Sequence, residues 1–239
     1  DQPGMRKPRK LRSRKAGLPP GTLVHIGEIK TPSASYSLID FDEHGLQETR
    51  FAEPLALTQH ACQHATRWAN VYGASSPTDL ATVGSAFGLH PLVQEDILNN
   101  AQRQKLDAYE DYLYLVLHRY ELQGNALDLV QDQISLIIGR DYVLTFQERP
   151  SQTFEPIRQR LRSGHHSLRK GGVDMLAYSL IDTVVDSYFG VIEQLNDYAE
   201  KLEDKILGRP DPATLEGIHQ LKRCVSQLRR NLHPLREVL

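Results

Sequence analysis

The sequence is poor in cysteine and tryptophan and has no long uninterrupted apolar run. Its 239 residues include two cysteines, Cys62 and Cys224, which excludes a disulfide scaffold and is typical of a reducing compartment. No segment approaches the roughly 18 to 20 apolar residues that cross a bilayer, and no apolar signal segment follows the N-terminus. A composition of 40% hydrophobic and 24% charged residues excludes disorder and collagen, and predicts a soluble chain with a sizeable core.

The motifs of familiar enzymes are absent as well. The sequence has no G-x-x-x-x-G-K-[ST] loop, no G-x-G-x-x-G after a strand, no G-x-S-x-G elbow, no H-E-x-x-H and no C-x-x-C. This absence argues against nucleotide binding or hydrolysis, and it leaves open an unusual carboxylate-based metal site.

Charge is distributed unevenly along the chain. The formal net charge is −2, but residues 1–15 hold seven basic residues and one acid, so the remainder is acidic. A basic segment that contains Pro3, Gly4 and Pro8 cannot build a core, and we expect residues 1–20 to form a flexible tail. Such a tail is either simply solvated or contacts an anionic membrane surface or nucleic acid. The acidic remainder argues against a nucleic-acid-binding protein as a whole.

Strand and helix patterns alternate in the next part of the chain. Runs of β-forming residues predict strands at 23–30, 36–41, 48–52, 67–72, 112–120, 133–138 and 142–147. Helical patterns occupy 54–65, 78–87 and 90–99. The tight turns at Gly124-Asn125 and Gly139-Arg140-Asp141 indicate that the last three strands form an antiparallel meander. A mixed sheet with helices packed on it is therefore expected for this part of the chain, an α/β (α+β) fold.

The C-terminal part of the sequence carries a seven-residue apolar repeat on two helices. Over 173–207 the repeat consists of Ile181, Val185, Tyr188, Ile192, Leu195, Ala199, Leu202 and Ile206. A Gly/Pro break at 208–212 separates it from a second repeat, at Ile218, Leu221, Val225, Leu228, Leu232, Leu235 and Leu239. These repeats predict a long antiparallel helical hairpin. Pro234 should kink the second helix or begin a new one, and the missing stop signal before Leu239 indicates a chain cut from a longer protein.

Several charged residues could carry chemistry. An acidic stripe follows the first hairpin helix at Asp182, Asp186, Glu193, Asp197, Glu200 and Asp204. Like charges one turn apart repel, so the stripe needs a counter-charge. This is either a divalent cation or the basic repeat on the second helix (Lys222, Arg229 and Arg236, with Arg223 and Arg230 beside it).

Three smaller groups of residues could also form functional sites. The acidic pair Glu95-Asp96 on a short helix is either a solvated helix face or part of a Mg²⁺ site shared with another element. His60, Cys62 and His64 have a spacing that suggests zinc, but on the expected helix Cys62 would lie opposite both histidines. His165-His166 is expected to lie in a loop.

Five segments of the sequence resemble the cytosolic N-terminal part of CorA-type magnesium/cobalt transport proteins, and together they cover nearly all of the chain in order. They are GLPPGTLVHIGE (17–28), HPLVQEDILNNAQRQKLDAYEDYLYLVL (90–117), VLTFQE (143–148), YSLIDTVVDSYF (178–189) and HQLKRCVSQLRRNLHPLREVL (219–239). The resemblance implies an α/β/α sandwich with a mixed, partly antiparallel sheet over residues 21–170. A long antiparallel helical hairpin would follow over residues 171–239.

The same resemblance implies a setting and a metal site. It implies a further stalk helix and two transmembrane helices beyond Leu239, a pentamer around one pore, and a position on the cytoplasmic side of the cell inner (plasma) membrane. It implies no enzymatic activity. The family's cytosolic carboxylates bind Mg²⁺ between subunits and hold the pore closed. They match Glu95, Asp96 and Asp182, and Asp186 is added as a fourth candidate. Mg²⁺ would then be both regulator and cargo, with Co²⁺ as a second cargo.

Three alternatives stay open at this point. The chain could be the corresponding domain of a zinc-transporting branch of the same superfamily. It could be a soluble metal-dependent hydrolase that uses Glu95, Asp96 and Asp182, provided that these carboxylates converge within one subunit. It could also be a purely structural oligomerisation module, in which the acidic stripe pairs with the basic one.

Overall fold

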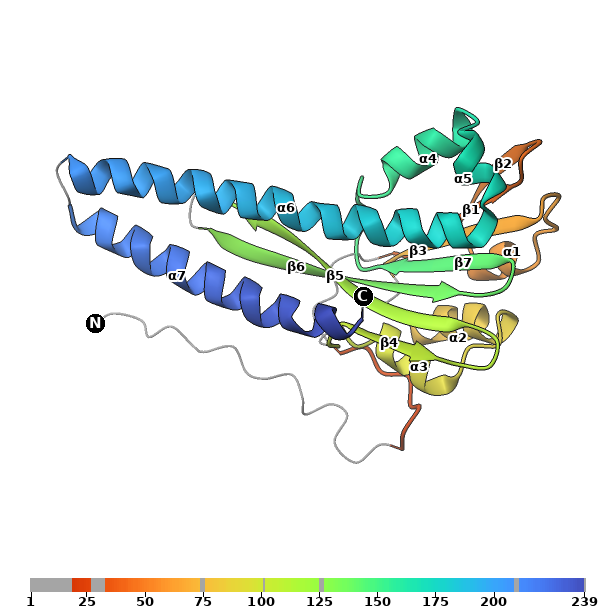
Figure 1. The fold of residues 1–239 in the computed structure, drawn as a ribbon. Helices are drawn as coiled ribbons and strands as arrows, with labels where there is room; N and C mark the ends of the chain where they lie inside the picture. Colours follow the sequence, from red (N-terminus) through yellow and green to blue (C-terminus); the bar gives the residue numbers. More distant parts are fainter. Residues whose placement is uncertain are drawn as a thin grey trace.

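A seven-stranded sheet with helices on both faces forms the body of the protein, and a long helical hairpin extends from it (Figure 1). The computed structural model describes residues 19–26, 33–73, 76–100, 102–124, 127–208 and 211–238. The strands are β1 (Ser35–Phe41), β2 (Leu46–Phe51), β3 (Thr66–Tyr72), β4 (Lys105–Ala108), β5 (Leu113–Gln123), β6 (Asp128–Ile138) and β7 (Tyr142–Gln147). The helices are α1 (Pro54–Thr58), α2 (Pro77–Ala86), α3 (Pro91–Ile97), α4 (Glu155–Arg162), α5 (His166–Lys170), α6 (Gly172–Leu207), α7 (Pro212–Leu232) and the 3-10 helix η2 (His233–Glu237).

The sheet is mixed, as expected. Its strand order is β2-β1-β3-β7-β6-β5-β4. The pair β3–β7 is parallel, whereas every other neighbouring pair is antiparallel. The meander predicted for the last three strands is confirmed, because β5 pairs with β6 and β6 pairs with β7.

The sheet buries both of its faces, which makes the body an α/β/α sandwich. Side chains alternate between the faces along each strand. In β5, Leu115 and Leu117 belong to the core beneath α4, α5, α6 and α7, while Tyr114 and Val116 belong to the core beneath α1, α2 and α3. Trp68 marks the first core, where its indole N–H donates to Thr145 Oγ1 at 3.0 Å. The fold class expected from the sequence is therefore confirmed.

The hairpin is present, but its packing differs from a two-helix coiled coil. Helix α6 packs on β5 and β7 as well as on α7, so its buried residues face the sheet in addition to the second helix. Several members of the predicted repeat are consequently exposed, among them Ile192 at 40% and Ile206 at 46%. The turn between the helices ends in a capping box, in which the Asp211 carboxylate accepts the Thr214 N–H. Pro234 stands near the start of η2, so the predicted break in the second helix is confirmed.

Length and mean hydropathy alone would allow one helix of the described ranges, α6, to span a membrane. Of its most apolar window, 39% is buried inside the protein. A core helix passes the same test, so this finding is weak evidence for a membrane span.

Other secondary-structure predictions need correction. The helix expected at 54–65 ends at Thr58, because the buried Asp40 carboxylate accepts the N–H groups of Gln63 and His64 and holds that stretch extended beside β1. Within the strand expected at 23–30, the described residues make only an isolated bridge between Ile26 and Asn99; residues 27–30, like the tail segment 1–18, lie outside the described ranges. Strand β4 and helices α4 and α5 were not predicted. His166 begins α5, so the loop expected there is wrong.

Candidate metal-binding carboxylates

Helix α3 places the predicted acidic pair at its C-terminal end. The helix starts at Pro91, and the preceding His90 caps it by accepting the Leu92 N–H on its ring nitrogen at 3.2 Å. Val93 and Ile97, one turn apart, are buried against the sheet. That anchoring fixes the rotation of the helix and leaves Glu95 and Asp96 partly exposed.

Asp96 is held from three sides. Lys105 Nζ lies 2.8 Å from its Oδ2, and the Gln102 amide donates to its Oδ1. Its backbone carbonyl accepts the side-chain amide of Gln133 at 3.2 Å. The Asp96 side chain is 19% exposed, so the carboxylate is fixed in position but still reachable from solvent.

Lys105 supplies the positive charge next to this carboxylate. Burial lowers the pKa of the ammonium, but hydrogen bonds to Asp107 and Asp96 outweigh the burial and raise it overall. Lys105 therefore stays protonated and neutralises Asp96 when no metal is bound. The sequence reasoning missed this lysine, since nine residues and the end of a helix separate it from Asp96.

Glu95 contacts the N-terminal segment of the described chain. Its Oε2 accepts the backbone N–H of Gly21. Gly21 has a φ of 84°, and a Cβ at this position would lie 3.1 Å from Cβ of Pro91, so a glycine is required for the close approach. The isolated bridge between Ile26 and Asn99 fixes the same segment beside the end of α3.

Asp182 and Asp186 lie on the exposed side of α6. Within the described part of the chain, none of the α6 carboxylates forms an ion pair with a basic residue of α7. The basic repeat of α7 is exposed too. The intramolecular pairing of the two stripes, one of the sequence alternatives, is therefore wrong for this chain: among the described residues the acids of α6 and the bases of α7 make no ion pair with each other.

The histidines near Cys62 have separate roles. His64 Nδ1 lies 2.9 Å from Oδ2 of Asp42, and this contact is the main reason why the pKa of Asp42 is lowered to about 2. The ring of His60 packs edge-on against Phe51, with the centroids 5.3 Å apart. Cys62 is partly buried, and burial raises the pKa of its thiol. A helix through residues 60–64 was expected to turn Cys62 away from the two histidines. Helix α1 ends at Thr58, so none of these three residues lies on it.

The predicted ligands do not converge within one chain. Across the described ranges, no group of three or more His, Cys, Asp or Glu side chains is arranged to hold a metal ion. The hydrolase alternative required Glu95, Asp96 and Asp182 to meet beside a cleft in one subunit, so it loses its structural basis. Asp96 is the best-positioned single ligand, because it is fixed by neighbours yet open to solvent.

Comparisons with known proteins agree on one family. The model of the CorA-like Mg²⁺ transporter protein family matches residues 63–239. The cobalt/magnesium transport protein CorA of Thermotoga maritima is 38% identical over 231 residues, which cover 95% of this chain and 64% of that protein. The chain thus spans less than two thirds of this relative.

Two solved structures share the fold. The soluble domain of CorA from Methanocaldococcus jannaschii superposes with a TM-score of 0.67 at 16% identity, covering 88% of this chain and 79% of that one. The ZntB cytoplasmic domain from Vibrio parahaemolyticus gives a TM-score of 0.56 at 12% identity, covering 86% of this chain and 80% of that one. At these identities the two likenesses show a shared fold.

Proposed function

This chain belongs to the family of CorA-like Mg²⁺ transporter proteins, and we propose that it is the cytosolic Mg²⁺-sensing portion of a divalent-cation channel. The named members of the family are transporters rather than enzymes. In this proposal the complete protein is a homopentamer in the inner (plasma) membrane, and it carries Mg²⁺ and also Co²⁺. Residues 21–170 form the sandwich that carries Glu95 and Asp96. Residues 171–239 form the hairpin that leads toward the membrane, and residues 1–20 are a basic tail.

The proposed sensor is a Mg²⁺ ion that bridges carboxylates of adjacent subunits. Asp96, supported by Glu95, would face Asp182 and Asp186 of a neighbouring copy. Facing carboxylates repel, and Mg²⁺ turns that repulsion into a link because it prefers a few carboxylate oxygens while keeping most of its water. The ion favours the closed arrangement only to the extent that it binds that arrangement more tightly than the open one.

The observation that carries this proposal is the state of Asp96 in the single chain. Its carboxylate is oriented by Gln102 and neutralised by Lys105, while Gln133 holds its backbone carbonyl. A fixed, partly exposed carboxylate with a displaceable ammonium suits a ligand that must bind and release Mg²⁺ as the concentration changes. Asp182 and Asp186 are exposed on α6 and would supply the carboxylates that face Asp96 from the neighbouring subunit.

The zinc-transporting alternative is less well supported. The relative with 38% identity is named for cobalt and magnesium, and the ZntB likeness extends to the fold alone. The four candidate ligands are carboxylates, whereas zinc sites usually recruit imidazole or thiolate.

Protease protection of the intact membrane protein across a Mg²⁺ titration tests the proposal. Wild type should become more resistant as Mg²⁺ rises, and Asp96→Asn should need at least about tenfold more Mg²⁺ for the same protection, since it loses a charged ligand. Asp111→Asn is the control, because Asp111 is an exposed carboxylate that is not a proposed ligand. Equal midpoints for wild type and Asp96→Asn would contradict the sensor role. Protection that does not respond to Mg²⁺ at all would favour the purely structural module.

A further inference from the structure

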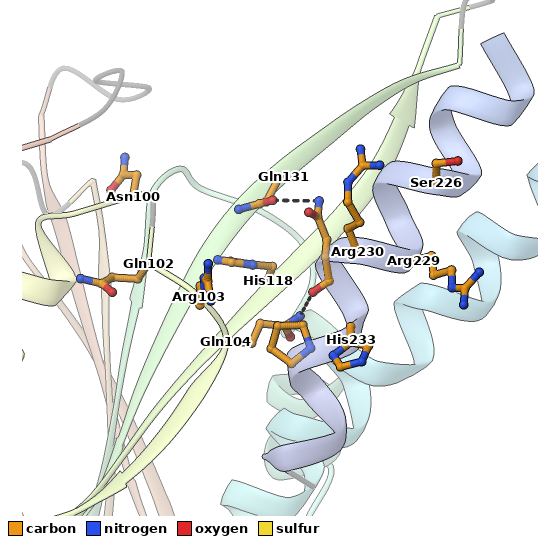
Figure 2. A pocket seen from close by; sticks show the side chains of 12 residues that line it. Asn100, Gln102, Arg103, Gln104, His118, Gln131, Ser226, Arg229, Arg230 and His233 are labelled. Carbon is orange, nitrogen blue, oxygen red and sulfur yellow. Dashed lines mark hydrogen bonds between the residues drawn. The ribbon is translucent and has the colours of Figure 1, made fainter. Parts of the chain in front are cut away.

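A wide cleft separates α7 from the edge of the sheet (Figure 2). Its volume is about 980 Å³. One wall consists of α7 and η2, and the opposite wall consists of β5, β6 and the segment that joins α3 to β4. Neither the fold comparison nor the proposed Mg²⁺ sensor assigns a role to this space.

The cleft carries charge of one sign. None of the 12 residues that line it is Asp or Glu, whereas Arg103, Arg230, His118 and His233 all contribute to its walls. Within the described part of the chain, neither Arg103 nor Arg230 forms an ion pair. A concave surface lined by a single sign of charge concentrates its field and attracts counter-ions.

The basic side chains come from both walls. Figure 2 shows Arg103 on the sheet side and Arg230 on α7, whose neighbour Arg229 also lines the cleft. The two walls are tied together by Asn231, whose carbonyl accepts the Gln104 amide at 2.8 Å and whose amide donates to Gln131 Oε1 at 3.4 Å. These hydrogen bonds hold together the two walls that carry Arg103 and Arg230.

We propose that this cleft binds a triphosphate chain in its metal-free form. Arg103 on one wall and Arg230 on the other bind different phosphates of the chain. Guanidinium groups bind phosphate oxygens in a bidentate fashion, and a ligand that reaches both walls must be longer than a single phosphate. The sequence has no glycine-rich phosphate loop, so side chains rather than backbone amides hold the ligand.

The metal-free form is preferred for an electrostatic reason. A Mg²⁺ ion bound to the triphosphate cancels two of its negative charges, which weakens its attraction to the arginines of the cleft. The cleft therefore selects the species that increases when Mg²⁺ becomes scarce. Its rim includes Gln102, whose amide also donates to Asp96, so the two regions are adjacent.

Calorimetric titration of the 239-residue chain in EDTA tests the proposal with three probes: ATP, inorganic tripolyphosphate and AMP. ATP or tripolyphosphate should bind, and AMP should bind at least about tenfold more weakly because it cannot span both walls. Equal binding of ATP and tripolyphosphate assigns the site to the phosphates alone, whereas tighter binding of ATP shows that the nucleoside is also recognised. Both outcomes support the proposal.

The variant Arg103→Ala/Arg230→Ala should weaken triphosphate binding at least about tenfold. Both arginines are exposed, so the fold should persist, and far-UV circular dichroism checks this. Arg160→Ala, an exposed arginine on α4, is the matched control and should bind like wild type. Unchanged affinity of the double variant, no binding by wild type at millimolar triphosphate, or tighter binding of the Mg²⁺ complex than of the metal-free anion would each overturn the proposal.

Discussion

Lys105 and Asp96 form an ion pair at the end of α3, with Nζ 2.8 Å from Oδ2. The same ammonium lies 2.5 Å from Oδ2 of Asp107, so one lysine neutralises two carboxylates. The pair stabilises the metal-free arrangement and keeps Asp96 oriented. A divalent cation that binds Asp96 must displace this ammonium or bind beside it, which makes Lys105 a determinant of how much Mg²⁺ is needed.

Replacing this lysine should therefore increase the affinity for Mg²⁺. In Lys105→Met the apolar stem is kept and the charge is lost. Mg²⁺ then no longer competes with an ammonium group for the Asp96 carboxylate. We expect the Mg²⁺ midpoint of protease protection to fall about threefold to tenfold in the intact protein. The change is limited to this range because the lysine is 32% exposed and solvent screens the pair.

An exposed lysine elsewhere provides the control for that experiment. Lys170→Met on α5 removes the same charge at a distance from Asp96 and should leave the midpoint unchanged. A midpoint that rises in Lys105→Met would show that the lysine supports metal binding instead of competing with it.

The attachment of α6 to the sheet depends on a buried hydroxyl. Tyr188 is 5% exposed, and its O–H donates to the carbonyl of His118 at 2.8 Å, with Gln104 Oε1 at 3.3 Å. Tyr188→Phe leaves these acceptors without their donor and should lower the free energy of unfolding by about 1–2 kcal/mol in urea denaturation. Tyr178→Phe, at a position 62% exposed on the same helix, should have almost no effect. Equal losses in both variants would contradict this account.

Two glycines in the hairpin should respond in opposite ways to alanine. At Gly190 a Cβ would meet nothing within 4 Å, so Gly190→Ala should gain about 0.5–1 kcal/mol of stability from helix propensity. At Gly217 a Cβ would lie 2.7 Å from Leu202 Cδ2 and 3.0 Å from the Tyr198 hydroxyl. Gly217→Ala should lose that gain or become destabilised, because Leu202 is itself buried. Thermal denaturation of the two variants side by side measures the difference, and a larger gain at Gly217 would refute the close helix contact.

The contact between His64 and Asp42 should be visible in the acid titration. A hydrogen bond from His64 is the largest cause that lowers the pKa of Asp42, from 3.8 to about 2, and the backbone N–H groups of His44 and Gly45 add to it. Because the folded pKa is depressed, the contribution of Asp42 to stability is complete above pH 3.8 and is lost as the pH falls toward 2. In His64→Phe, the carbon-13 NMR midpoint of the Asp42 carboxyl should move up toward 3.8. His44→Phe should leave it in place, because the backbone N–H of that residue is unchanged.

Much of the fold could be predicted because the patterns involved are local. Alternation in β5, the apolar run in β6, the glycine turns between the strands of the meander and the Pro234 break in the second hairpin helix all depend on neighbouring residues. Short elements were harder to predict. Helix α1 stops at Thr58 because Asp40, distant in sequence, captures the following N–H groups, and β4 is a strand only because it pairs with β5.

The hairpin shows the same division. Its two helices were predicted from periodicity, but the repeat was assigned to contact between the helices. The buried face of α6 also packs on the sheet, from Leu180 through Val184 to Tyr188, and contacts α7 farther along at Leu202. A repeat in the sequence shows that a helix has an apolar side, and it does not tell which partner covers that side.

The candidate carboxylates were found through resemblance, whereas their surroundings came from the structure. Nothing in the order of residues indicates that Gln102, Gln133 and Lys105 would gather around Asp96. The basic cleft between Arg103 and Arg230 was equally unforeseen, since more than a hundred residues separate these two arginines in the chain.

By itself the amino-acid order determined the class of fold and the helical hairpin, because propensity, turn chemistry and periodicity act between residues close in sequence, and its resemblance to known sequences indicated the family. Tertiary structure alone decided which charges meet. A single ammonium neutralises Asp96 and Asp107, the acids of α6 lie apart from the bases of α7, and two arginines face a space without a carboxylate. Electrostatic interactions depend on distance through space, and that distance is set only when the sheet and helices pack.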